Sequence, residues 1–331
     1  MATGIQEPAW PAMPPLAAWQ DTYATLHRWV QIVGKLRLEL TPLVNHWWNT
    51  ALHVGARGLT TLAMPCSGRW VEASFDFLSH DLLLATSEGL QRHVPLYPRS
   101  VAEFYGEVMG ALDALCLPVA INPAPQEIPE AIPFDQDDQH RSYDVAAVRR
   151  WWLATLQAAS VLEEFRSRFR GKCSPVHFFW GSFDLAVSRF SGRRAPPRPG
   201  ADYVTREAYS DEVSSAGFWP GGGSVDSAAF YSYFAPEPRG YSSAIARPRS
   251  AWYHRQLREF VLPYEDLRRE ESPRASLLHF LQSTYEAGAD LAGWDREALE
   301  RHGDEAGRPT PAPGEEATSP PSTGGPEAAG P

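Results

Sequence analysis

Side chains that could do chemistry are concentrated in one stretch near the middle of the chain, GKCSPVHFFWGSFDLAVSRFSGRR, residues 171–194. Successive side chains of a β-strand point to opposite faces, so alternation divides such a stretch into two sets. One set begins at His177 and is mostly apolar, which suits packing under helices. The other set combines a carboxylate, serines and aromatic rings, as ligand pockets do: Phe178, Trp180, Ser182, Asp184 and Ser188. A polar strand face that is only solvated shows the same pattern, and this alternative stays open.

A second dense segment, SDEVSSAGFWPGGG (residues 210–223), places Glu212 near serines, a tryptophan and three consecutive glycines. The glycines allow a tight turn or a close approach to a ligand. They do not form a phosphate loop, because neither G-x-x-x-x-G-K-[ST] nor G-x-G-x-x-G is present. We therefore predict a small-molecule site, which could belong to an enzyme, in a cleft between residues 177–190 and 212–223. Its expected ligand-binding residues are Trp180, Ser182, Asp184, Arg189, Glu212, Ser214 and Trp219.

Three residues are candidates for catalysis: Asp184, His53 and Glu212. Aligning the strands that are expected to open at His46 and His177 places His53 opposite Asp184. A histidine paired with a carboxylate can serve as a general base, provided that the two groups meet at about 3 Å. No H-E-x-x-H, H-x-H or C-x-x-C spacing occurs, so no metal site is expected, and nothing in the sequence names a cofactor.

Composition restricts the partners of the chain. The formal net charge is -10, which argues against nucleic acid because phosphate binding needs a basic face. No run of eighteen apolar residues occurs, so no membrane span is expected. The three cysteines lie far apart and cannot all pair, which predicts reduced thiols in the cytoplasm. The N-terminus lacks the features of a secretory signal. The oligomeric state is not indicated.

The elements that would position these residues are long helices separated by groups of strands. Helical spacing of apolar residues and capping signals predict four helices. The first begins near Leu16 and ends at Gly34 or Leu40, and the second begins at Ser100. The third runs from Asp144 to Gly171, and the fourth runs from Ser272 to Gly293. Both halves then run helix, antiparallel strands, helix, with a histidine and two aromatics opening a strand after the first long helix. We predict an α+β fold of antiparallel sheet packed by long helices, in which a pseudo-two-fold axis relates two duplicated halves.

Proline-rich and acidic segments suggest where this body divides. A stretch rich in proline near the middle reads as a connector, and the last thirty residues contain no large apolar side chain, which is typical of disorder. The predicted units are a flexible lead at 1–14, a first half at 15–121, a connector at 122–143, a second half at 144–302 and a disordered tail at 303–331.

The motifs GKCSPVHFFWGSFDLA and EVSSAGFWPGGG, together with HRWVQIVGKLRLELTPLVNHWWNTALHVGARGLTT, resemble a family of uncharacterised bacterial proteins of the actinobacterial type. The resemblance covers roughly residues 14–294 and implies a cytoplasmic bacterial protein. It implies no activity, cofactor or site residue. Two other functions stay open beside the small-molecule site: a protein–protein module anchored by exposed tryptophans (Trp10, Trp47, Trp180 or Trp219), and a purely structural role.

Overall fold

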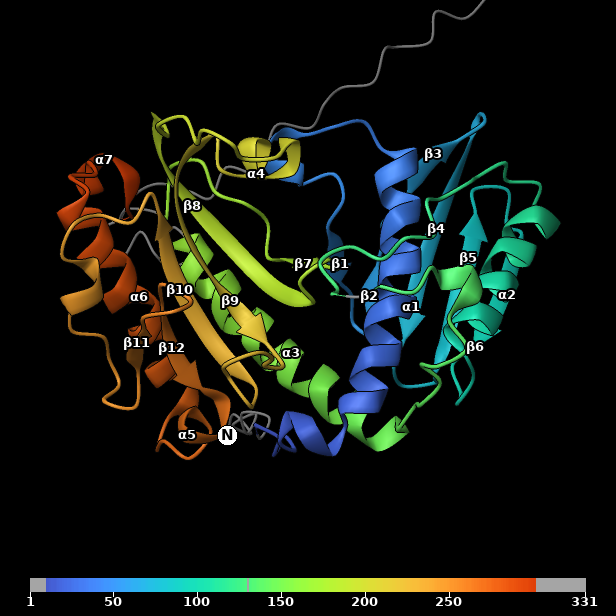
Figure 1. Ribbon diagram of the computed structural model, residues 1–331. Helices are drawn as coiled ribbons and strands as arrows, with labels where there is room; N and C mark the ends of the chain where they lie inside the picture. Colours follow the sequence, from blue (N-terminus) through green and yellow to red (C-terminus); the bar gives the residue numbers. More distant parts are fainter. Residues whose placement is uncertain (1–9, 130, 302–331) are drawn as a thin grey trace, which may run out of the picture.

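The computed structural model describes residues 10–129 and 131–301. In this part of the chain, twelve strands form a single antiparallel sheet in the order β11-β12-β10-β9-β8-β7-β1-β2-β4-β5-β6, and β3 pairs with β4 beside this path. Helices pack against both halves of the sheet (Figure 1). The predicted α+β class is therefore confirmed.

Strands and helices alternate in groups along the chain. The strands of the first half are β1 (Leu52–Val54), β2 (Leu59–Thr60), β3 (Met64–Cys66), β4 (Arg69–Asp76), β5 (Asp81–Thr86) and β6 (Gln91–Pro95). Those of the second half are β7 (His177–Phe179), β8 (Asp184–Arg194), β9 (Asp211–Trp219), β10 (Ala229–Ala235), β11 (Trp252–His254) and β12 (Glu259–Pro263). The α-helices are α1 (Gln20–Leu40), α2 (Val101–Ala114), α3 (Val145–Ser167), α4 (Tyr203–Ala208), α5 (Tyr264–Leu267), α6 (Pro273–Leu291) and α7 (Arg296–Leu299).

Local chemistry explains where the long helices begin and end. The Ser100 side chain accepts from the Glu103 backbone while the Glu103 carboxylate accepts from the Ser100 backbone, which is the predicted capping box of α2. Asp144 caps α3 in a similar way by accepting from two backbone amides. Helix α1 continues through Gly34 to Leu40, which settles the alternative that the sequence left open.

The two halves share one sheet, because β1 pairs with β7 through Leu52–Phe178 and His53–His177. Residues His46 to Trp48, which were expected to open a strand, instead lie in a 3-10 turn, and His46 has a φ of 58°. The local match between the halves is therefore weaker than the sequence indicated. The duplication remains a prediction.

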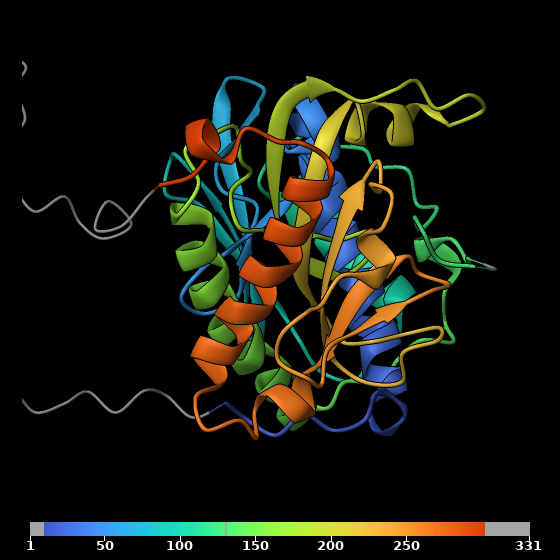
Figure 2. The same cartoon turned by 90° about the vertical axis from the view of Figure 1, so that its left-hand side faces the viewer.

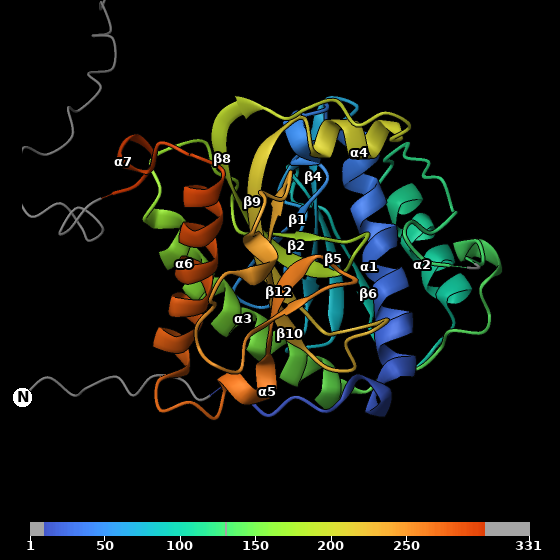
Figure 3. The ribbon, with the colours of Figure 1, turned by 60° about the vertical axis from the view of Figure 1, so that its left-hand side comes forward.

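The helices cover the sheet unevenly. Helices α3 and α6 contact each other and pack on strands β8, β9 and β10, and Figure 2 shows α6 running beside α3 over these strands. Helix α1 contacts α2 and β3, and in Figure 3 the strands of the second half lie between α6 and α1. Buried aromatic pairs join the layers, such as Trp29 of α1 stacked on Phe104 of α2 with ring centroids 4.6 Å apart.

The start of the described chain is docked on the second half. Trp10 packs on Phe230 and Tyr264, with ring centroids 6.2 and 5.9 Å apart. The Pro11 carbonyl accepts from the Tyr264 hydroxyl at 2.8 Å, and the Met13 amide donates to the Glu265 carboxylate at 3.0 Å. This corrects the expectation of a flexible lead for residues 10–14. Residues 1–9 and the predicted tail at 303–331 lie outside the described residues.

Candidate functional site

The stretch that was predicted to be one strand is a hairpin. Strand β7 ends at Phe179, residues 180–183 form a turn in which Phe183 has a φ of 60°, and β8 begins at Asp184. Across this hairpin Phe179 pairs with Asp184 and His177 pairs with Ala186. Paired residues lie on the same face of a sheet, so His177 and Asp184 share a face instead of lying on opposite ones. The predicted alternation is wrong because the turn shifts the register.

The register through β8, β9 and β10 assigns the remaining candidates to two faces. We call the face with Asp184, Gly217, Tyr231 and Tyr233 the tyrosine face, and the face that packs on α3 and α6 the helix face. The predicted site residues fall on both. Trp219 lies on the tyrosine face, whereas Arg189, Ser214 and Glu212 belong to the helix face. Segments 177–190 and 212–223 contain strands β8 and β9, which pair directly with each other. No cleft separates them, so we look for the candidate site on the tyrosine face that they share.

Arg189 is buried against aromatic rings of helices α3 and α6, and its Nε and Nη1 have no hydrogen-bond partner among the described residues. It is 1% exposed, and its guanidinium lies 3.4 Å from the centre of the Phe165 ring and 4.4 Å from that of Tyr285. It also donates to the Phe165 carbonyl of α3. Burial lowers the pKa of Arg189 to about 9. Arg189 therefore lies between strand β8 and helices α3 and α6, on the face opposite Asp184.

Asp184 is the centre of the tyrosine face. Its side chain is buried, and its two carboxylate oxygens accept from the hydroxyl groups of Ser182 and Tyr231. Tyr231 reaches Asp184 by crossing strand β9 at Gly217, where a Cβ atom would lie 2.5 Å from the tyrosine oxygen. Burial raises the pKa of Asp184, and burial followed by the nearby Asp184 charge raises that of Tyr231 well above its ordinary value. The phenol therefore stays protonated and acts as a donor.

Two further carboxyl groups lie within electrostatic reach of Asp184. Glu259, on β12, is half-buried, and burial together with the charge of Asp184 raises its pKa to about 7. Glu127 is exposed overall, but its carboxyl end lies against Gly181, and the same two causes raise its pKa. Among the described residues, no lysine, arginine or histidine forms an ion pair with Asp184, Glu127 or Glu259. A carboxyl group with a pKa near 7 can accept or donate a proton at neutral pH.

Helix α1 holds the hairpin turn through a stripe of polar side chains that the sequence patterns above did not single out. Tyr23, His27, Gln31 and Lys35 are each four residues apart, so they share one face of the helix. His27 Nε2 lies 3.0 Å from the Trp180 carbonyl oxygen and 2.9 Å from that of Gly181. Burial lowers the pKa of His27 to about 4, so at neutral pH its Nε2–H donates to both carbonyls.

The next residue of the stripe attaches the connector to this turn. The amide of Gln31 donates to the Gln126 carbonyl and accepts from the Gln126 backbone N–H, both at 2.8 Å. At the start of the stripe, burial and the charge of Asp184 raise the pKa of Tyr23 to about 12. The stripe therefore places α1 and the connector beside the carboxyl groups.

Trp180 and Ser182 differ in accessibility. Trp180 is 7% exposed, its indole N–H donates to the Thr50 carbonyl at 2.9 Å, and its ring packs against Gly34 of α1. It supports the turn and has no free surface for a ligand. Ser182 is exposed and bonded to Asp184, so it lies where a ligand could reach the carboxylate.

His53 does not pair with Asp184. It lies opposite His177 on β1, two strands away from β8, and neighbouring strands are about 4.8 Å apart. Among the described residues, no hydrogen bond joins His53 to Asp184. Burial and the nearby Arg37 lower the pKa of His53 to about 4. The predicted general-base pair is therefore not present in this structure.

Comparison of the sequence with known protein families finds a match. A family model described as a family of unknown function, DUF5996, matches residues 10–301. The chain belongs to the DUF5996 family. No curated protein and no solved structure matches the chain. The predicted resemblance to an uncharacterised family is thus confirmed. The tyrosine face described above is therefore part of a DUF5996 protein.

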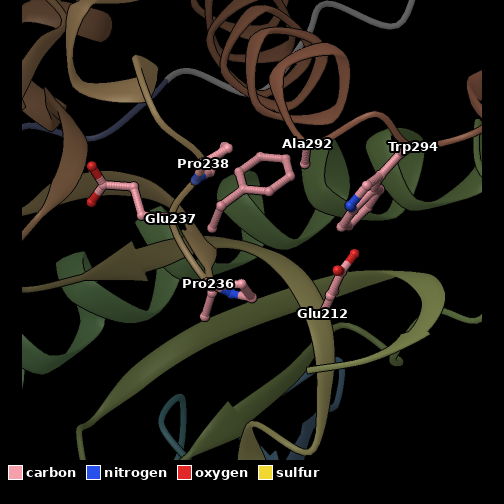
Figure 4. A pocket seen from close by; sticks show the side chains of 8 residues that line it. Glu212, Pro236, Glu237, Pro238, Ala292 and Trp294 are labelled. Carbon is pink, nitrogen blue, oxygen red and sulfur yellow. The ribbon is translucent and has the colours of Figure 1, made fainter. Parts of the chain in front are cut away.

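Glu212 contributes to a separate pocket of this DUF5996 protein, with a volume of about 190 Å³ (Figure 4). Phe234 and Trp294 form apolar walls and the Glu212 carboxylate points toward them, whereas the Glu237 carboxylate is directed away. Both carboxylates already have partners, since Arg193 pairs with Glu212 at 2.7 Å and Arg258 pairs with Glu237 at 3.1 Å. The pocket lies on the side of the helix face, away from Asp184. The remaining residues that line it are Ala235, Pro236, Pro238 and Ala292.

The described part of this DUF5996 chain contains neither a cluster of metal-ligating side chains nor a helix that could span a membrane. No cluster of three or more histidine, cysteine, aspartate or glutamate side chains could hold a metal ion there. No helix between residues 10 and 301, Glu130 aside, has the length and apolarity to cross a membrane.

Proposed function

We propose that this protein binds a small organic amine on the tyrosine face, with Asp184 as the principal acceptor. The observation that carries the proposal is the buried Asp184 carboxyl, which has two hydroxyl donors and no cationic partner among the described residues. A buried carboxylate is costly unless it is paired. An ammonium group would supply the missing charge.

The surroundings of Asp184 favour a cation over an anion. Burial, and after it the charge of Asp184, raises the pKa of both Glu127 and Glu259, so each of these carboxyl groups repels that of Asp184 when both are ionised. A bound cation would lower all three pKa values together. An anion would add to the repulsion. Tyr231, Tyr233 and Trp219 lie on the same face, and aromatic rings of this kind attract organic cations.

The alternative of a protein–protein module loses the anchors on which it was based. Trp180 is buried, and Trp10, Trp47 and Trp219 are half-buried. Trp10 packs on Phe230 and Tyr264 of its own chain. Trp47 likewise packs on Tyr203 of its own chain, with ring centroids 5.3 Å apart, so three of the four tryptophans are engaged within the chain and the small-molecule function has better support.

The test is a thermal-shift screen of the purified protein against primary, secondary and quaternary alkyl and aryl amines at pH 8, followed by calorimetric titration of the hits. Matched alcohols and carboxylates serve as ligand controls. A ligand at a hundred times its Kd stabilises a protein by about 2.7 kcal/mol. We expect amines alone to stabilise it, with binding lost in Asp184→Asn and weakened in Tyr231→Phe.

Glu212→Gln is the matched variant, because it also removes a carboxylate but lies in the pocket on the other side of the sheet. It should bind the amine as the wild type does. Stabilisation that survives in Asp184→Asn, or a screen in which no amine stabilises the wild type, would overturn the proposal.

A further inference from the structure

The pocket that Glu212 lines on the helix face is a cavity that the amine site on the tyrosine face does not use. Its volume of about 190 Å³ is below the roughly 300 Å³ at which pockets for drug-sized ligands begin, so it suits a ligand of one or two rings. The rings of Phe234 and Trp294 meet in it, with centroids 5.2 Å apart and an interplanar angle of 57°. Pro236 and Pro238 extend the apolar lining. A flat, largely apolar ligand therefore matches these walls.

The end of helix α6 holds Trp294 in place without help from a ligand. Gly293 has a φ of 62°, the Trp294 backbone N–H donates to the Ala289 carbonyl at 2.9 Å, and the Gly293 N–H donates to the Asp290 carbonyl at 3.1 Å. These are the two backbone bonds of a Schellman cap. The indole ring then packs on Tyr285, with ring centroids 6.1 Å apart. Its nitrogen lies on the edge directed into the pocket (Figure 4), and no group among the described residues accepts from it.

Only one oxygen of the Glu212 carboxylate is engaged by the protein. The Ser191 hydroxyl donates to Oε2 at 2.9 Å, and Nε of Arg193 donates to the same oxygen at 2.8 Å. No described residue donates to Oε1. The carboxylate points toward Trp294 (Figure 4), so a ligand in the pocket can donate to it.

Arg193 makes the pocket unsuitable for an ion. Its guanidinium pairs with Glu212 at 2.7 Å, so the negative charge of the carboxylate is already balanced. It also donates to the Ala292 and Gly293 carbonyls, at 2.8 and 3.2 Å, which fixes the pair against the end of α6. An anionic ligand would compete with Glu212 for the guanidinium, and a cationic one would compete with Arg193. An uncharged ligand leaves the pair intact.

We propose that this pocket binds an uncharged heteroaromatic ring that carries an N–H donor beside a ring acceptor, as the edge of a nucleobase does. The ligand N–H donates to Glu212 Oε1, the Trp294 indole N–H donates to the ring acceptor, and the ring lies against Phe234. Each polar group of the pocket then has a partner when the ligand covers it. The inference is independent of amine binding at Asp184, because the two sites lie on opposite faces of the sheet.

The experiment uses matched pairs of probes that differ only in the amino group. 9-Methyladenine is compared with 9-methylpurine, and 1-methylcytosine with 1-methylpyrimidin-2-one. Binding of each probe to the full-length protein is measured at pH 8 by ligand-observed NMR and by calorimetric titration. We expect the better amino-bearing probe to bind at least about tenfold more tightly than its partner, since that is the contribution of one hydrogen bond to a charged group.

Variants then assign the two hydrogen bonds. Trp294→Phe keeps an aromatic wall but removes the indole donor, so it should weaken binding of the amino-bearing probe about fivefold. Trp70→Phe is the matched control, because Trp70 is 53% exposed on β4 in the other half of the sheet, and it should bind as the wild type does. Glu212→Leu should abolish the preference for the amino-bearing probe while its partner still binds.

Thermal unfolding verifies that each variant is folded, and the comparison of probes in the wild type requires no variant. Equal affinities within both pairs of probes, or no binding of either amino-bearing probe, would overturn the proposal. A preference that survives in Glu212→Leu would overturn it as well.

Discussion

Replacing Glu259 by glutamine should stabilise the protein at pH 8 and leave its stability unchanged at pH 4. Burial and the charge of Asp184 raise the pKa of Glu259 from the ordinary 4.5 to about 7. Below the unfolded pKa both states bind the proton, so the group has no effect. As the pH rises toward 7, the unfolded state ionises first, and the folded state loses stability relative to it. Glutamine removes this loss because it never ionises.

The magnitude follows from the size of the pKa difference. It amounts to about 2.5, and each pKa unit corresponds to about 1.4 kcal/mol, so the upper bound is about 3 kcal/mol. Partial exposure of Glu259 screens the charge and reduces the expected gain to about 1–2 kcal/mol. With an unfolding entropy of about 2 cal/mol/K per residue, that gain raises Tm by about 2–3 °C.

The assay is thermal or urea unfolding of the wild type and Glu259→Gln at several pH values between 4 and 8. Glu270→Gln is the control, since Glu270 is exposed and the variant makes the same change in net charge. The reasoning fails if Glu259→Gln lowers Tm at pH 8, or if it and the control give equal shifts across the range. A gain that is as large at pH 4 as at pH 8 would also refute it.

Three further substitutions test the packing around the site. Gly217→Ala should cost about 3–5 kcal/mol, measured by urea unfolding, because its Cβ would lie 2.1 Å from the Leu185 carbonyl oxygen; a cost below about 1 kcal/mol would contradict the geometry. Gly34→Ala should lower Tm although alanine favours a helix by about 1 kcal/mol, since its Cβ would lie 2.3 Å from the Trp180 ring; a higher Tm would show that the ring moves freely. Ser100→Ala removes the cap of α2 and should cost about 1 kcal/mol by the same assay, whereas no change would mean that the capping box contributes nothing.

Local features of the fold could be predicted because their causes are local. The capping box at Ser100 and the cap at Asp144 depend on residues within one turn of the helix, so the sequence alone locates the starts of α2 and α3. The turn between Phe179 and Asp184 could not be located in this way. Residues 180–183 are held by His27 of α1, some 150 positions earlier in the chain.

The site was predicted only in part for the same reason. Alternation identified Asp184 as part of a polar face. Arg189 was added to the expected ligand-binding residues for its charge and not by alternation, and it points to the helix face. Tyr231 was missed because its contact with Asp184 depends on the register of three strands. The stripe from Tyr23 to Lys35 has a signal in the sequence, since polar residues recur every four positions within an apolar helix.

The docking of residues 10–16 on the second half has a consequence for biosynthesis. Met13 and Leu16 make backbone hydrogen bonds to Glu265 and Asp226, and Pro11 bonds to Tyr264. These residues can take their final places only after some 250 further residues have been translated. Contacts so distant in the sequence form slowly, so the segment around Trp10 stays undocked during synthesis until Tyr264 and Glu265 have been made.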